Sequence, residues 1–299
     1  MVNFALIGIG RWGTNYLFTI SKLKNCNLKY IYSPNIQSHL ELDEKYIKVN
    51  SYNQLVRHRD VDAFIVSSPA TTHFKIALDL IKKGHNLIVE KPMVVKYSQA
   101  LKLLKISKSS KSKIMVGHIY DYNEGFIITK QLIKKIGTIL SLEITNYANG
   151  PKRNDISVLM DRAYHGVYMC LSLLGKKPLF LYCSEKIKGI YKINFFYENK
   201  LKVKIKVSSR YSKKINNMKI NGEKGSIVFD DIKKNVILYK NDKIIKEESY
   251  YSEPLKMELI YFLKLIKGKS KSNLNEAVET VRVLNIAEKS LKLEKKLSL

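Results

Sequence analysis

Three glycines near the start of the chain have the spacing that a pyrophosphate-binding turn requires. Gly8, Gly10 and Gly13 directly follow the apolar run 4–7 and lead into a segment, 11–22, with a helical pattern. The first glycine permits a tight turn, the second lets backbone approach the pyrophosphate, and the third lets the helix pack on the strand. The helix N-terminus then faces the anion. A plain strand-to-helix turn would also explain the triplet taken alone.

A second group of polar residues follows a predicted buried strand that ends near Ser67. Ser68 and Pro69 come next, and the helical pattern from Thr71 places His73 in the first turn of a helix. The segment should therefore lie at the carboxyl edge of the sheet, where open α/β sheets bind their ligands. The alternatives are structural, because Thr71 could simply cap the helix and His73 could fill a polar gap.

A pair of oppositely charged residues follows a later predicted strand. The apolar run 87–89 stops at Glu90 and Lys91, and Pro92 biases Lys91 toward extended backbone, which fixes the direction of its side chain. A lysine there can hydrogen-bond a substrate hydroxyl or a nicotinamide ribose, and partial burial would lower its pKa toward a range useful for proton transfer. Glu90 and Lys91 could also be an ordinary surface ion pair.

A carboxylate and an imidazole stand four residues apart in the segment 160–165. On a predicted helix this spacing puts Asp161 and His165 on one face. Histidine can move a proton at neutral pH, and a neighbouring carboxylate can orient it or raise its basicity. Two metal ligands could have the same spacing, but no third candidate ligand is apparent, so no metal is expected. A surface pair on the helix is the structural alternative.

Composition indicates an ordinary folded protein of two domains. The chain has 299 residues, of which 45% are hydrophobic, and this length exceeds what one core comfortably serves. We expect no leader, no membrane span and a cytoplasmic location. Cys26, Cys170 and Cys183 lack a C-x-x-C spacing and indicate neither a disulfide framework nor a zinc site.

The formal net charge of +27 is the other notable property of the composition. Such a charge could attract nucleic acid, an anionic membrane, or anionic substrates such as nucleotide sugars. Lysine is spread along the whole chain, however, which favours solvated lysine faces over a dedicated binding patch.

The first 120 residues alternate strand-like and helix-like segments, which predicts a parallel, doubly wound sheet. Strands are expected near 2–8, 27–33, 46–49, 62–67, 86–90 and 113–117.

The pattern then changes to helices near 123–136 and 160–174 and many short strands, which predicts an α+β domain with an open, largely antiparallel sheet. Two closing helices, about 254–267 and 273–292, are expected to pack back on the first domain. The expected fold class is α/β, with domains at 1–120 and 121–299.

Five motifs, taken together in their order, resemble the Gfo/Idh/MocA family, named for glucose-fructose oxidoreductase and inositol dehydrogenase. They are G-I-G-R-W-G at 8–13, S-S-P-A-T-T-H at 67–73, V-E-K-P at 89–92, V-G-H-I-Y-D-Y-N at 116–123 and D-R-A-Y-H at 161–165. The resemblance implies a Rossmann domain joined to an α/β domain whose open sheet often forms the oligomer interface, hence a homodimer or homotetramer. It also implies pyridine-nucleotide-dependent oxidation or reduction at a sugar or polyol carbon.

The resemblance further implies a set of residues that bind the cofactor, NAD or NADP. They come from the glycine turn and from the ends of later strands: Gly8, Gly10, Arg11, Trp12, Gly13, Ser33, Ser68, Pro69, His73, Glu90 and Lys91.

The same resemblance assigns catalytic and substrate-binding roles. His165 matches the general acid/base, with Asp161 one helical turn before it, and Lys91 matches a lysine that contacts both cofactor and reacting hydroxyl. The Trp12 turn and residues 149–155 most resemble members that act on nucleotide-linked amino sugars or their uronic acids in surface-polysaccharide synthesis. Lys152 and Arg153 are then candidate contacts for an anionic substrate.

Three positions depart from the family's pattern. The second strand ends in Tyr-Ser-Pro-Asn without the carboxylate that usually binds the adenosine ribose of NAD, and no arginine follows Ser33, so NAD and NADP stay open. Ala163 replaces a usual glycine, and Tyr168 stands where a carboxylate is frequent, which puts the substrate geometry in doubt.

The resulting hypothesis is an oxidoreductase that transfers a hydride between nicotinamide and a sugar carbon, with His165 moving the hydroxyl proton and Lys91 orienting that hydroxyl. One rival is a non-catalytic sensor or scaffold that binds the cofactor. A second rival, a basic nucleic-acid-binding protein, lacks any recognised binding motif, and no nucleic-acid partner is expected.

Overall fold

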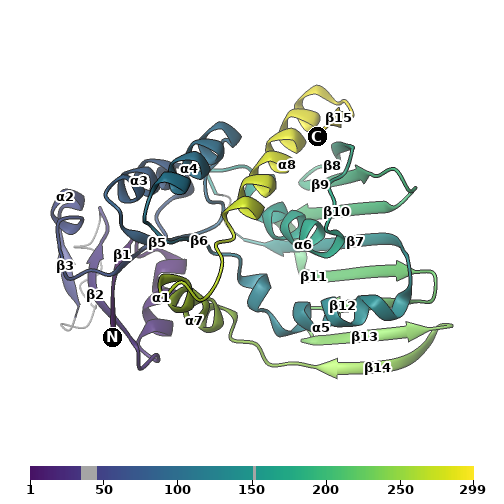
Figure 1. Ribbon diagram of the computed structural model, residues 1–299. Helices are drawn as coiled ribbons and strands as arrows, with labels where there is room; N and C mark the ends of the chain where they lie inside the picture. The colour runs from purple at the N-terminus through teal and green to yellow at the C-terminus, as the bar shows by residue number, and fades with distance from the viewer. Residues whose placement is uncertain (35–45, 151–152) are drawn as a thin grey trace. The chain divides into compact units, whose positions relative to one another are not determined.

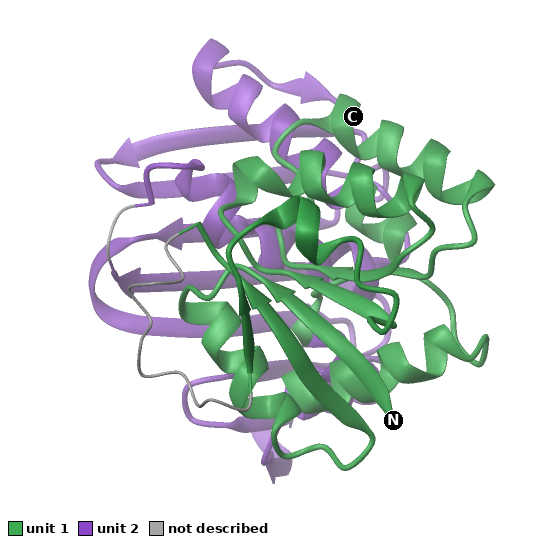
Figure 2. Ribbon diagram, turned by 90° about the vertical axis from the view of Figure 1, so that its left-hand side faces the viewer, with its two compact units in different colours: residues 1–119, 255–278 green, residues 120–254, 279–299 purple. Residues whose placement is uncertain are grey.

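The computed structural model describes residues 1–34, 46–150 and 153–299. The chain divides into two compact units, each built from two stretches of sequence. The first unit comprises residues 1–119 and 255–278, and the second comprises residues 120–254 and 279–299 (Figures 1 and 2). Each unit has its own sheet and is described by itself.

Within the described residues, the first unit contains a six-stranded sheet in the order β3-β2-β1-β4-β5-β6, and all of the strand pairs are parallel. This order is that of a doubly wound dinucleotide-binding sheet, in which β1 and β4 flank the point where the strand order reverses. The strands are β1 (Val2–Ile7), β2 (Cys26–Tyr32), β3 (Ile47–Val49), β4 (Ala63–Val66), β5 (Asn86–Val89) and β6 (Ile114–Val116).

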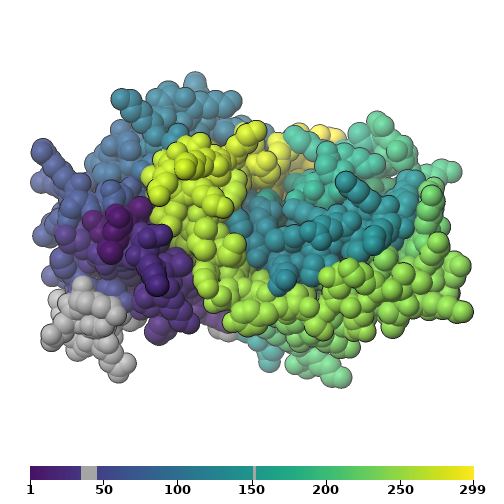
Figure 3. Space-filling view, turned by 60° about the horizontal axis from the view of Figure 1, so that its bottom comes forward, coloured from purple at the N-terminus to yellow at the C-terminus, as the bar shows by residue number. Residues whose placement is uncertain are grey.

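Helices cover both faces of this sheet, which is why its central strands are continuous apolar runs. The helices are α1 (Arg11–Ile20), α2 (Tyr52–Leu55), α3 (Ala70–Lys82), α4 (Tyr97–Ser109) and α7 (Pro254–Ile266). Phe4 of β1 lies in one core cluster with residues of α1 and α7, and its ring centroid is 6.2 Å from that of Phe262. Figure 3 shows the yellow-green α7 lying against the purple N-terminal segment.

The second unit is built on a nine-stranded sheet, counted over the described residues, in the order β14-β13-β12-β11-β7-β10-β9-β8-β15. Only β10 and β7 pair in parallel, and the other pairs are antiparallel. The strands are β7 (Ile139–Asn149), β8 (Phe180–Ile187), β9 (Ile190–Phe196), β10 (Lys202–Ser208), β11 (Arg210–Gly222), β12 (Gly225–Asp230), β13 (Asn235–Lys240), β14 (Lys243–Ser249) and β15 (Leu297–Ser298).

One face of this sheet is apolar and packs against helices. The helical elements of the second unit are a 3-10 turn at Ile119–Tyr122, α5 (Glu124–Leu132), a second 3-10 turn at Ile133–Ile136, a π-helical turn at Leu159–Ala163 and α6 (Tyr164–Leu174). A Cβ on Gly166 of α6 would lie 3.0 Å from Ile205 of β10, which shows how closely the helix approaches the sheet. Helix α8 (Leu274–Leu293) begins in the first unit and continues in the second.

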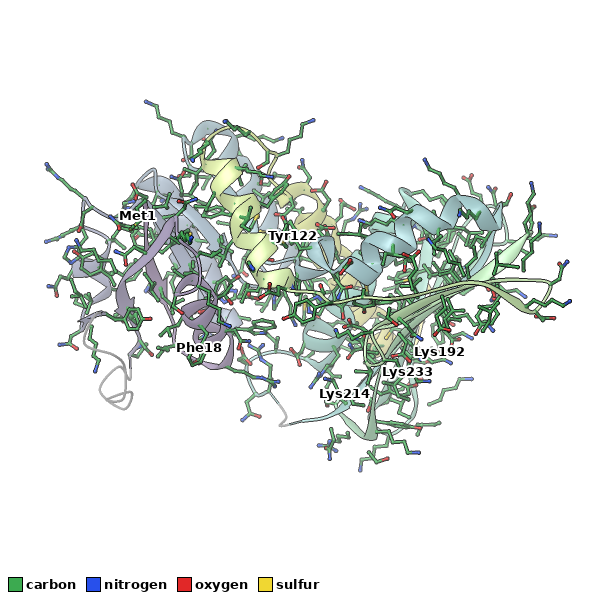
Figure 4. The ribbon with its side chains drawn as sticks, turned by 90° about the horizontal axis from the view of Figure 1, so that it is seen from below. Met1, Phe18, Tyr122, Lys192, Lys214 and Lys233 are labelled. Atoms are coloured by element: carbon green, nitrogen blue, oxygen red, sulfur yellow. The ribbon has the colours of Figure 1, made fainter. Side chains whose placement is uncertain are left out.

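The opposite face of the same sheet is rich in lysine. Inward-facing Val203, Ile205 and Val207 of β10 are buried, and the lysines that alternate with them point the other way. Figure 4 shows Lys192 and Lys214 on the side of the sheet away from α5 and α6.

The structure confirms the predicted fold class, a parallel doubly wound sheet followed by a largely antiparallel one. In the described part of the chain, no helix combines the length and the apolar character needed to cross a membrane.

Candidate functional site

The glycine turn after β1 is held by close main-chain contacts. Gly8 has a φ of +94°, and a Cβ there would lie 2.6 Å from the Cα of Ser68. A Cβ on Gly13 would lie only 2.1 Å from the carbonyl oxygen of Gly8. The same carbonyl oxygen of Gly8 accepts a hydrogen bond from the hydroxyl of Ser67 at 2.7 Å. Two of the three glycines are therefore required by the fold itself.

Gly10 is different, because no atom lies within 4 Å of the place where its Cβ would be. It precedes α1, and no side chain caps the N-terminus of this helix. First-turn N–H groups carry the positive end of the helix dipole and need an acceptor. The open space and the uncapped helix end fit a pyrophosphate, which is the role predicted for this turn.

The other predicted residues of the turn differ in exposure. Arg11 is exposed at the start of α1, and Trp12 is partly buried against the core cluster of the first unit. The carbonyl oxygen of Tyr32 accepts a hydrogen bond from the N–H of Gly8 at 2.8 Å. Ser33 is the next residue along the chain, so it directly follows a residue that is bonded to the glycine turn.

His73 ties two strand ends together. Its side chain is 1% exposed, with Nδ1 2.9 Å from the carbonyl oxygen of Pro92 and Nε2 2.8 Å from that of Ser68. Both ring nitrogens thus face main-chain carbonyls of the protein. This geometry favours a positioning role for His73, in which it holds the segments after β4 and β5 side by side.

Glu90 and Lys91 follow β5 as predicted, but they do not form a simple surface pair. Glu90 is buried, and its Oε2 accepts a hydrogen bond from the backbone N–H of Lys91 at 3.0 Å. Gly117 leaves room for this carboxylate, since a Cβ there would lie 3.0 Å from Oε1 of Glu90. Lys91 itself is partly exposed. The buried glutamate therefore fixes the backbone that carries the lysine.

Sequence reasoning missed the partners of Glu90. The hydroxyl of Tyr16, on α1, lies 2.9 Å from Oε1 of Glu90 and 2.9 Å from Oε1 of Glu258, on α7. All three side chains are buried. The sequence did contain a signal, because Tyr16 and Glu258 stand among apolar residues of predicted helices. Polar groups that become buried in this way require hydrogen-bond partners.

In the second unit the structure changes one expectation. Residues 159–163 form a π-helical turn rather than the start of an α-helix, so Asp161 and His165 do not stand on a continuous α-helical face. Asp161 forms ion pairs with two arginines. Its Oδ1 is 3.6 Å from Nη1 of Arg153, and its Oδ2 is 3.4 Å from Nε of Arg162. π-helical turns are often found at functional sites.

The predicted substrate contacts have different outcomes. Arg153 donates to both carboxylate oxygens of Asp155, at 2.9 and 2.6 Å, so its charge is already balanced within the chain. These hydrogen bonds, above all, raise the pKa of Arg153. Lys152 lies outside the described residues.

His165 packs against an aromatic ring that is held in place by a buried network. The ring centroids of Tyr120 and His165 are 5.1 Å apart in an edge-to-face arrangement. The hydroxyl of Tyr120 donates to Asp231 at 3.1 Å and accepts from Asn216 at 2.7 Å. Burial first, and then Asp231, raises the pKa of Tyr120, so the phenol stays neutral. Tyr250 also donates to Asp231, at 2.8 Å.

Tyr168, one of the departures from the family's pattern, is anchored rather than loose. It is buried, and its hydroxyl donates to the carboxylate of Asp121. The carboxylate expected near this place is therefore supplied from the 3-10 turn that precedes α5. Sequence reasoning quoted this segment as a motif without assigning a role to Asp121.

Other titratable groups are unsuited to catalysis. Burial lowers the pKa of His118 to about 3 and raises the pKa of Cys170 to about 12, so neither the imidazolium nor the thiolate is available at neutral pH. Burial likewise raises the pKa of Cys183 to about 12. Among the described residues, no group of three or more His, Cys, Asp or Glu side chains is arranged to hold a metal ion.

Comparison with known proteins identifies the N-terminal region. Residues 2–118 match the GFO_IDH_MocA model, described as an oxidoreductase family with an NAD-binding Rossmann fold. The chain is 27% identical over 143 residues to 2,7-anhydro-N-acetylneuraminate hydratase of Escherichia coli (strain K12), covering 47% of this chain and 38% of the relative. It is 27% identical over 121 residues to UDP-N-acetylglucosamine 3-dehydrogenase of Acidithiobacillus ferrooxidans, covering 40% and 38%. These matches thus span 38% of each curated relative.

Solved structures resemble the whole chain in fold. The structure of the same UDP-N-acetylglucosamine 3-dehydrogenase has a TM-score of 0.88 at 17% identity and covers 97% of this chain and 98% of its own. GenD2 from gentamicin A biosynthesis, in complex with NAD, has a TM-score of 0.88 at 18% identity and covers 100% and 96%. At these identities the likeness shows the fold alone.

The two kinds of glycine in the turn should separate by mutation. Replacing Gly10 by alanine should leave the melting temperature unchanged, because its φ of −72° suits alanine and the space is open. The same change should weaken NADH binding by about tenfold or more, because the methyl group takes the place of the pyrophosphate. Gly13→Ala should fail to fold. NADH affinity is measured by fluorescence titration, and stability is measured by thermal melts. Equal NADH affinity of Gly10→Ala and wild type would contradict the assignment of this turn to the pyrophosphate.

Proposed function

We propose that the chain is an oxidoreductase of the Gfo/Idh/MocA family, whose model matches residues 2–118, and that it uses NAD or NADP to oxidise or reduce a carbinol or ketone carbon of a sugar. The observation that carries the proposal is the turn at Gly10, where an uncapped helix N-terminus faces open space at the carboxyl edge of a doubly wound sheet. When bound, the nicotinamide ring supplies the hydride acceptor or donor.

Residues of the first unit would hold this cofactor. Gly10 and the first turn of α1 would bind the pyrophosphate, and Ser68 and Pro69 would lie beside the nicotinamide half. His73 would act indirectly, by fixing the main chain at Ser68. Ser33, directly after β2, is proposed to meet the adenosine ribose, and the choice between NAD and NADP depends on this region.

Lys91 is proposed to orient the reacting hydroxyl and to stabilise the negative charge that develops on its oxygen. An ammonium group does this by donating hydrogen bonds, and its effect is greatest where water is excluded. The backbone N–H of Lys91 donates to Glu90, and this contact limits the directions from which the lysine side chain can start. Glu90 is a positioning residue in this account.

His165 is proposed to take the hydroxyl proton during oxidation and return it during reduction. The edge contact with Tyr120 limits the orientations of the imidazole, and the hydrogen bonds of Tyr120 limit those of the phenol ring. Asp161, in the π-helical turn that precedes α6, is proposed to tune the charge near His165, although it also balances Arg153 and Arg162.

A nucleotide-linked amino sugar or its uronic acid is the proposed substrate class. One relative is named a UDP-N-acetylglucosamine 3-dehydrogenase, and the net charge of +27 would steer a dianionic substrate toward the protein. Arg153 and Lys152 are the proposed contacts, Arg153 in competition with Asp155. Such a reaction would serve surface-polysaccharide synthesis.

We also propose a cytoplasmic homo-oligomer, a dimer or tetramer, that associates through the lysine-rich face of the second sheet. On this face Lys204 and Lys206 lie 3.5 and 2.6 Å from Glu143, and Lys192 pairs across the strands with Lys206. Burial and then Lys204 and Lys206 lower the pKa of Lys192, as expected for clustered like charges. Association through this face should therefore strengthen with added salt, which sedimentation at several salt concentrations would measure.

Replacing Lys91 by alanine should lower turnover by about two orders of magnitude, with nucleotide binding much less affected, because the stabilising ammonium is needed mainly in the transition state. The measurement is the change in nicotinamide absorbance with a panel of UDP-sugars and free polyols. Lys111→Ala, at an exposed lysine of the same unit, is the matched control. Unchanged turnover in Lys91→Ala would remove the lysine from the mechanism, and no turnover by wild type on any substrate would favour a cofactor-binding sensor.

Replacing His165 by asparagine should lower kcat by about a hundredfold and flatten the acidic limb of the pH–rate profile for oxidation. The sign follows from chemistry, because only neutral imidazole can accept the proton, so oxidation should fall at acidic pH. His85→Asn, at a histidine whose Nε2 lies 3.2 Å from the carbonyl oxygen of Val56, is the control. A profile with an unchanged acidic limb would assign the proton to another group.

A further inference from the structure

One phenol hydroxyl stands between two buried carboxyl groups in the first unit. The Oη atom of Tyr16 is 2.9 Å from Oε1 of Glu90 and 2.9 Å from Oε1 of Glu258. Tyr16 and Glu258 are 0% exposed and Glu90 is 4% exposed, so water does not separate the charges. The three residues come from α1, the end of β5 and α7, far apart in the sequence.

The number of protons follows from the donors. A phenol has one proton and can donate it to one carboxylate only. At 2.9 Å the other contact is also a hydrogen bond, and it needs a proton of its own, which must come from the second carboxyl group. Two ionised carboxylates this close in a buried place would repel each other strongly, which also favours one neutral carboxyl group.

We propose that Tyr16, Glu90 and Glu258 share two protons, one on the phenol and one on a carboxyl group, and that this buried link makes Tyr16 and Glu258 positioning residues for Lys91. Burial, then the charge of Glu258, then that of Glu90, holds the pKa of Tyr16 well above its usual range, so the phenol keeps its proton. The second half of the proposal rests on the proposed function.

The link reaches Lys91 through Glu90. Oε1 of Glu90 meets Tyr16, and Oε2 accepts the backbone N–H of Lys91 at 3.0 Å, so the carboxyl group is held at both oxygens. Glu258 attaches this arrangement to α7, which packs on Phe4 of β1 through Phe262. A shift of the carboxyl group would therefore move the main chain that carries the lysine.

Infrared spectroscopy tests the shared proton without any assay of activity. At neutral pH the difference spectra of wild type minus Glu258→Gln and of wild type minus Glu90→Gln should each contain the C=O band of one protonated carboxyl group. Each glutamine can donate to the phenol oxygen as the carboxyl group did, so both variants should fold. Glu279→Gln, which removes the ion-pair partner of Lys177, is the control and should give no such band. Absence of the band from both test spectra would overturn the proposal.

Steady-state kinetics test the positioning role. Tyr16→Phe should lower kcat by about tenfold while the KM for the nucleotide changes less than about twofold, because binding residues are untouched. Tyr52→Phe removes a phenol–carboxylate hydrogen bond of 2.8 Å to Asp79 in the same unit and should leave kcat unchanged.

A second pair of variants separates positioning from mere loss of structure. Glu258→Gln should retain most of the wild-type kcat, whereas Glu258→Ala should lose it. Equal kcat values for wild type, Tyr16→Phe and Tyr52→Phe would overturn the positioning role. A wild type without turnover would instead overturn the proposed function and the role of Lys91 with it, and the infrared result would still decide the shared proton.

Discussion

The contact between helix α1 and the turn after β1 is the constraint on which the first unit depends. A side chain at residue 13 would meet the carbonyl oxygen of Gly8 at 2.1 Å, so the helix can approach this closely only with glycine there. That approach sets the position of the helix N-terminus, where an anion can bind. It also sets the position of Tyr16, on the same helix, whose hydroxyl reaches Glu90. Cofactor binding and the support of Lys91 thus depend on the same packing.

Neighbouring strand ends are joined by hydrogen bonds that leave their polar residues little freedom. Ser67 donates to the Gly8 carbonyl, and His73 lies between the carbonyl oxygens of Ser68 and Pro92. The ends of β1, β4 and β5 are therefore fixed to one another by side chains as well as by the sheet. In the second unit, Asp231 similarly restricts a neighbouring side chain, because it accepts a hydrogen bond from Tyr120, whose ring packs on His165. Both arrangements restrict the surroundings of a residue that is proposed to act on substrate, Lys91 in the first unit and His165 in the second. Such preorganisation favours catalysis.

Local patterns explain which features could be predicted from the sequence. The glycine spacing, the alternation of strands and helices, and the apolar runs depend on neighbouring residues, and they indicated the parallel sheet and the edge where Lys91 lies. The Tyr16–Glu258 contact joins residues 242 positions apart, so no local pattern could show it. The π-helical turn at 159–163 was missed because its sequence has an ordinary helical period, and the role of Asp121 depends on a contact with Tyr168 from α6.

The central proposal is that the first unit binds a nicotinamide nucleotide at its glycine turn, with Lys91 beside the nicotinamide half. A crystal structure of the chain with NADH tests it most directly. The pyrophosphate should lie over the backbone of Gly10, and the Lys91 ammonium should face the space next to C4 of the nicotinamide. A nucleotide bound elsewhere, or a Lys91 side chain that faces away from the bound nicotinamide, would contradict it.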